Sequence, residues 1–190
     1  IKGLYPDAMF KDRPKLKFLG NRRHISSTMA YVLVELEVGK LLDIVERMFD
    51  KCKEYIDGPT KGARALAKIK DYESIIDNIQ LEINDFISQV ISSGAEESES
   101  RSAIKLMRVA SDLEELADSL DKLTTMLTKY YEHWELSDNE KVVLLTFFSE
   151  VQNLYLSSMK IYHGEDVSQE DMDEVIQSTR ELKRSLMAER

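Results

Sequence analysis

Two pairs of carboxylates stand four residues apart in this chain, Glu73 with Asp77 and Glu114 with Asp118. On a helix, residues at this spacing lie one turn above each other on the same face. If the two helices pack side by side, the four acids form a cluster of oxygen ligands, which suit Mg²⁺, Mn²⁺ or Ca²⁺. The alternative is chance, because Asp and Glu make up 35 of 190 residues; the pairs then point apart into water and bind nothing. The spacing predicts Glu73, Asp77, Glu114 and Asp118 as the candidate cation site.

The composition is that of one mainly helical domain, with only seven Gly and three Pro in 190 residues. A net charge of -9 repels phosphate backbones, so we expect no nucleic-acid partner. The longest apolar stretch, 142–148, is far shorter than the roughly 20 residues of a membrane-spanning helix. The single cysteine, Cys52, fits a reducing compartment and is expected to be a small core residue. Because the chain starts at Ile1, we expect it to be a piece of a longer protein.

The elements that must position the acids are helices, because apolar residues recur every three or four positions throughout. A first helix is expected over about 25–56 and is ended by Gly58-Pro59. Its expected core-facing residues are Ile25, Met29, Val32, Leu36, Leu41, Ile44, Met48, Cys52 and Tyr55.

The second helix carries its apolar pattern over 69–90, and the third over 106–134. The third pattern ends in Leu127, Tyr130 and Trp134, all expected to face the core. Ser137 and Glu140 form a capping box that opens a fourth helix, and Ser168 caps a fifth. The sequence thus predicts an elongated all-α antiparallel bundle of three long helices followed by a shorter helix pair.

The acids flank the apolar stripes, with Asp121 extending the row, so they are not expected in the centre of the bundle. There is no Glu-x-x-His motif of the kind that di-iron bundle enzymes use. His24, His133 and His163 are far apart and show no ligand spacing. Neither a phosphate-binding loop nor a serine-nucleophile motif is present. We therefore expect no enzyme, and the alternative from that class is a carboxylate-metal enzyme built on a bundle.

The first 22 residues are interpreted as a linker and residues 23–190 as the bundle. The linker carries a basic run, Lys11, Arg13, Lys15 and Lys17. Anionic lipid attracts such residues by about 1 kcal/mol each. We expect the run to lie near a membrane surface, and the alternative is an ordinary solvated linker.

These motifs resemble those of a known family. The segment 101–118 has an early arginine and a D-L-E-x-x-x-D core, and it resembles the third helix of a PhoU repeat. The segment 73–77 looks like the matching motif of the second helix. The stretch from Asp12-Arg-Pro14 to Glu35-Leu-Glu37 is similar to the segment joining the membrane part of sodium/phosphate cotransporters to their C-terminal cytoplasmic PhoU-like domain.

The resemblance implies a PhoU-like bundle of one three-helix repeat plus a truncated second repeat. It also implies a surface metal cluster at the acidic motifs, and it allows iron or zinc there. The second repeat departs from the family pattern. If Ile176 takes the place of Ile69, Arg180 and Arg184 fall where Glu73 and Asp77 stand. The sixth helix of the family is absent from the pattern.

The resulting hypothesis is a cytoplasmic regulatory domain of a sodium-dependent phosphate cotransporter-like protein, at the cytoplasmic face of the inner or plasma membrane. The expected partners are the membrane transporter part of the same full-length chain, signalling proteins and a second copy as a homodimer. The alternative is a free-standing PhoU-like adaptor in phosphate signalling.

Overall fold

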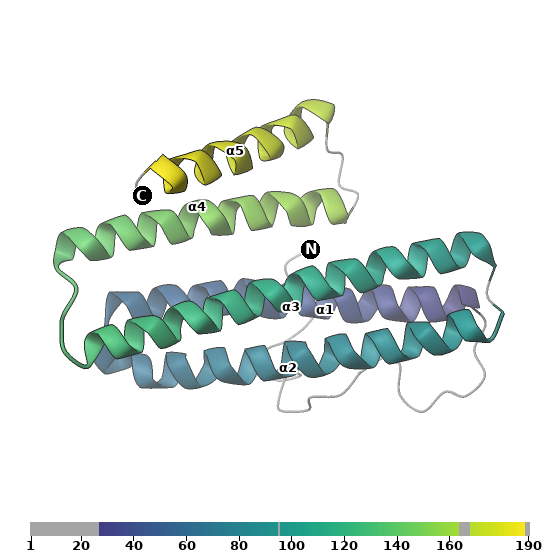
Figure 1. Cartoon of the computed structure of the whole chain (residues 1–190), viewed down its shortest axis with the longest axis horizontal. Coiled ribbons are helices and arrows are strands. Elements are labelled where there is room, and N and C mark those ends of the chain that lie inside the picture. Colours follow the sequence, from purple (N-terminus) through teal and green to yellow (C-terminus); the bar gives the residue numbers. More distant parts are fainter. Residues whose placement is uncertain (1–26, 95, 164–167, 189–190) are drawn as a thin grey trace.

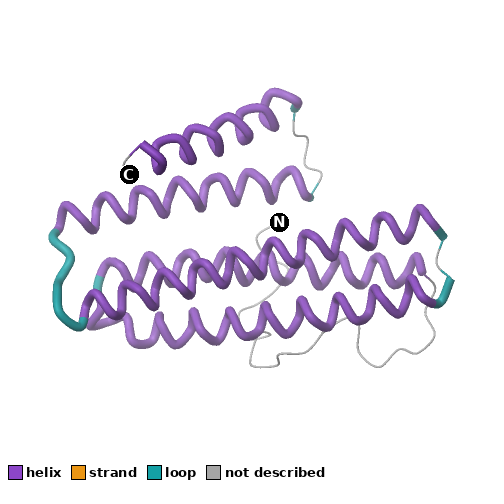
Figure 2. Tube along the Cα trace, in the orientation of Figure 1, coloured by secondary structure: helices purple, strands orange, loops and turns teal. Residues whose placement is uncertain are grey.

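The computed structural model describes residues 27–94, 96–163 and 168–188. Within this part of the chain all regular structure is helical and there is no strand, as Figure 2 shows. The five helices are α1 (Ser27–Asp57), α2 (Pro59–Ser92), α3 (Glu97–Tyr131), α4 (Asp138–Tyr162) and α5 (Gln169–Ala188). The expected all-α bundle, with three long helices before a shorter pair, is confirmed. The predicted linker 1–22, its basic run and His24 lie outside the described residues.

The helices form a three-helix bundle with two further helices stacked on one side (Figure 1). Helices α1, α2 and α3 each pack against the other two. Helix α4 packs on α1, and α5 packs on α4 alone among the described helices. Helix α1 is therefore the central element, because it contacts three neighbours.

The helix boundaries follow local turn chemistry. Helix α1 ends at Asp57, and α2 begins at once with Pro59 at its first position, where the missing N–H of proline costs nothing. This start is ten residues before Ile69, where the apolar pattern begins. Helix α2 is followed by Gly94, whose φ of 96° is a left-handed conformation that glycine adopts freely.

Both predicted N-terminal caps are present. The Ser137 hydroxyl accepts a hydrogen bond from the Glu140 N–H at 3.3 Å, and Glu140 accepts one from the Ser137 N–H at 2.8 Å. Ser168 caps α5 in the same way, accepting from the Asp171 N–H at 3.1 Å. These bonds satisfy N–H groups that have no partner within the helix.

The expected core face of α1 is wrong in its first half. Met29, Val32 and Leu36 are 48%, 44% and 42% exposed. The buried residues there are instead Ala30, Leu33, Val34, Glu37 and Val38. Because α1 contacts three helices, it is apolar around most of its circumference. More than one set of its apolar residues therefore has the helical spacing of a core-facing stripe.

Trp134 is a second correction, since it was expected to face the core. Helix α3 ends at Tyr131, so Trp134 lies in the following turn and is 68% exposed. Tyr130 is also partly exposed, whereas Leu127 packs against the core as expected.

Helix α4 is held on α1 by one aromatic cluster and two polar contacts. The Phe49 ring of α1 lies 5.5 Å from the Tyr155 ring and 6.4 Å from the Phe148 ring, centroid to centroid. The Tyr155 hydroxyl donates to the Leu42 carbonyl at 2.6 Å, and the Gln152 amide donates to Asp50 at 3.2 Å. Phe148, Gln152 and Tyr155 are the buried residues of α4.

Candidate functional site

The four candidate carboxylates lie on neighbouring antiparallel helices in matching register. The Gln80 side chain of α2 donates a hydrogen bond to the Ser111 hydroxyl of α3 at 3.1 Å. Asp77 stands three residues before Gln80, and Glu114 stands three residues after Ser111. In antiparallel helices this register places Asp77 opposite Glu114 and, one turn further, Glu73 opposite Asp118. The structure therefore brings the two pairs together.

The electrostatics show the same proximity. Burial raises the pKa of Glu73, and the charges of Asp121, Asp77, Asp118 and Glu114 raise it further. Burial also raises the pKa of Glu114, with the charges of Asp118 and Asp77 adding to it. Neighbouring like charges disfavour ionisation, so Glu73 and Glu114 take up protons more readily than isolated carboxyl groups do.

Two residues outside the four candidates belong to this cluster. Asp121 contributes the largest charge effect on Glu73, and one of its carboxylate oxygens is buried without a hydrogen-bond partner. Lys122 pairs with Asp118 and lowers the pKa of Glu114. Sequence reasoning noted Asp121 only as an extension of the acidic row, and it missed Lys122. The spacing of four between Asp118 and Lys122 was the available signal.

The side chains as they lie do not form a metal centre. In the described part of the chain, no group of three or more His, Cys, Asp or Glu side chains is arranged to hold a metal ion. Lys122 supplies the cation closest to Asp118 instead. The arrangement is thus an acidic surface with one internal counter-charge, and metal ligation would require Lys122 to leave Asp118.

Cys52 is a core residue, as expected from its place in the pattern. Its side chain is fully buried, and burial together with the charge of Asp121 raises the thiol pKa to about 12. A thiol with this pKa stays protonated near neutral pH, and so it is a poor nucleophile. His133 and His163 are exposed and follow the ends of α3 and α4.

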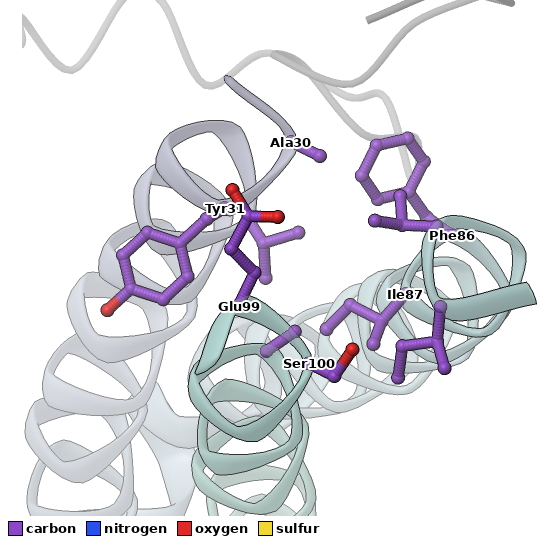
Figure 3. A pocket seen from close by; sticks show the side chains of 10 residues that line it. Ala30, Tyr31, Phe86, Ile87, Glu99 and Ser100 are labelled. Carbon is purple, nitrogen blue, oxygen red and sulfur yellow. The ribbon is translucent and has the colours of Figure 1, made fainter. Parts of the chain in front are cut away.

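A small hollow lies at one end of the bundle, where α1 begins, α2 ends and α3 begins (Figure 3). Its walls are mostly apolar, with Tyr31, Phe86 and Ile87 among them. The one carboxylate there, Glu99, accepts a hydrogen bond from the Glu96 N–H at 3.4 Å as part of the capping box of α3. This carboxylate therefore serves the helix end, and we assign no chemistry to the hollow.

Lowering the pH from about 7 toward 4.5 is expected to stabilise the fold through Glu73 and Glu114. Their folded-state pKa values are raised above the usual 4.5, so the folded protein takes up protons before the unfolded chain does. Their favourable contribution is complete below the unfolded pKa and is lost as the pH rises through the raised values. Thermal melts across this range should show a larger gain for the wild type than for a Glu73→Gln, Glu114→Gln variant. The same pH dependence in both proteins would contradict a contribution of Glu73 and Glu114 to the stability gained at low pH.

No helix among the described residues combines the length and apolar character needed to cross a membrane. A comparison with family models matches residues 38–125 to the family described as the PhoU domain. The matched range covers most of α1, all of α2 and most of α3, and it contains all four candidate carboxylates. No curated protein and no solved structure matches the chain.

Proposed function

Since residues 38–125 are a PhoU domain, we propose that this protein is the cytoplasmic regulatory domain of a sodium-dependent phosphate cotransporter-like protein. A PhoU domain implies a role in phosphate signalling or in the regulation of phosphate transport, and such domains are regulatory rather than catalytic. The family match is the observation that carries the proposal. The finer statement, a cotransporter, is supported by the resemblance of the stretch from Asp12 to Glu37 to the cotransporter junction.

We propose that the carboxylate cluster is the part of this domain that senses a divalent cation. Glu73 and Asp77 on α2 repel Glu114 and Asp118 on α3. A divalent cation at this point would neutralise the repulsion and favour close packing of the two helices, at the expense of the contact between Lys122 and Asp118. Oxygen donors favour Mg²⁺, Mn²⁺ or Ca²⁺, and the family resemblance also admits iron or zinc.

The proposed function can be tested in the source organism by an in-frame deletion of residues 27–188. We expect sodium-dependent phosphate uptake that no longer responds to external phosphate, because the regulatory part of the transporter is lost. The measurement is uptake of labelled phosphate at high and low external phosphate, with and without sodium. Uptake and a phosphate-starvation reporter that both match the wild type would overturn the proposal.

The sodium requirement distinguishes a cotransporter domain from a free-standing PhoU-like adaptor. If the deletion changes sodium-dependent uptake, the cotransporter proposal stands. If it alters the starvation reporter while uptake stays independent of sodium, the chain is a free-standing PhoU-like adaptor instead. In that case the match to the PhoU domain still accounts for the phenotype.

A further inference from the structure

Helices α4 and α5 are joined to the first three helices through one packing contact. Among the described helices, α4 packs on α1 and on α5, whereas α5 packs on α4 (Figure 1). Neither of the two packs against α2 or α3. Residues 132–137 supply the covalent link from α3 to α4. The position of the helix pair therefore depends on the contact between α4 and α1.

The contact of α4 with α1 is small and partly polar. Only Phe148, Gln152 and Tyr155 are buried on α4. By comparison, α3 buries Ala103, Leu106, Ala110, Leu113, Ala117, Leu120 and Thr124. Two of the three α4 residues meet α1 through hydrogen bonds, to the Leu42 carbonyl and to the Asp50 carboxylate. Such bonds add only modestly to the stability of the contact, because their groups bond to water once the helices separate.

Helices α1, α2 and α3 have a hydrophobic core of their own. Each of them packs against the other two, and no other described helix contacts α2. The apolar side chains that α2 buries therefore serve this core, and they are Ala65, Ile69, Ile76, Ile79, Ile83 and Ile87. The match to the PhoU domain, residues 38–125, also ends within α3 and includes no residue of α4 or α5. The three-helix bundle thus keeps its core when α4 is not seated on α1.

We propose that α4 and α5 open together, leaving α1, α2 and α3 folded as a three-helix bundle. When α4 leaves α1, α5 loses the described helix against which it packs. Helices in proteins draw most of their stability from such packing, so both lose protection in the opened state. The opening also removes the α4 cover from Phe49 of α1, whose ring lies against Phe148 and Tyr155 in the closed state. Elements that move in regulation are drawn from parts of low local stability, and the helix pair is such a part.

Native-state hydrogen exchange on the full chain tests this opening. The protected amides of α4 should exchange faster than the slowest amides of α2, because the opening takes less free energy than complete unfolding. Tyr155→Phe removes the hydrogen bond to Leu42 and should speed exchange in α4 about fivefold. The slowest amides of α2 should speed up by the same factor, since complete unfolding breaks the same bond.

The variant that distinguishes partial from complete unfolding is Ile79→Val, which shortens a fully buried side chain of α2 by one carbon. It should speed the slowest amides of α2 about fivefold and leave those of α4 unchanged, because the opened state retains the core around Ile79. Circular dichroism establishes that both variants are folded. Equal acceleration of α2 and α4 by Ile79→Val would overturn the proposal, since the chain then unfolds in one step. So would α4 amides that exchange as slowly as those of α2, or that do not respond to Tyr155→Phe.

Discussion

Replacing Phe49 by alanine is expected to lower the free energy of unfolding by about 3–5 kcal/mol. The Phe49 side chain is fully buried on α1 and lies against both Phe148 and Tyr155 of α4. Its removal leaves a cavity at the contact through which α4 is held on the first three helices. Chemical denaturation followed by helical circular dichroism measures this loss of unfolding free energy. In the folded variant, the hydrogen bond from the Tyr155 hydroxyl to the Leu42 carbonyl should also break more often.

The control for Phe49→Ala is Val142→Ala, an apolar truncation on α4 at a side chain that is 61% exposed. A change at such a surface position should stay within about 0.5 kcal/mol. If Phe49→Ala costs no more than this control, the aromatic cluster does not hold α4 on α1, and the stacking of the two parts must rest on other contacts.

A divalent cation is expected to stabilise the wild-type protein by about 2.7 kcal/mol at one hundred times its dissociation constant. The reason is the repulsion among Glu73, Asp77, Glu114 and Asp118, which a bound cation would relieve. Thermal melts with Mg²⁺, Mn²⁺, Ca²⁺, iron or zinc, set against melts in a chelator, would show which ion raises the midpoint. A Glu73→Gln, Asp118→Asn double variant should gain nothing from the same ion.

The matched control is an Asp85→Asn, Asp112→Asn variant, which removes two exposed acids from α2 and α3 outside the cluster. It should keep the response to the cation, because general screening by salt is the same in both double variants. If no ion raises the wild-type midpoint by more than it raises the midpoint of the Glu73→Gln, Asp118→Asn variant, there is no cation site, and the cluster responds only to protons. That outcome leaves the match of residues 38–125 to the PhoU domain intact.

The sequence by itself determined the helices and the identity of the acidic pairs. The spacing of apolar residues, the capping residues and the helix-breaking residues are local features of the sequence. Ser137, Ser168 and Gly58-Pro59 therefore mark helix ends without knowledge of the fold. The two carboxylate pairs could also be assigned to single helix faces from spacing alone. A short connection between two long helices predicts antiparallel neighbours, and this is how the pairs come to face each other.

Only the tertiary structure decided which faces are covered. Met29, Val32 and Leu36 have the period of a core stripe, yet α1 turns other residues toward its three neighbours. Trp134 continues an apolar pattern past the end of α3, because a pattern does not record where the backbone leaves the helix. The exposure of Arg180 and Arg184 on α5, which packs on α4, depends in the same way on neighbours. Which side chains are buried depends on contacts between helices that are distant in sequence. The spacing of apolar residues along the chain therefore allows more than one buried face for a helix, and the packing of the helices decides which face is buried.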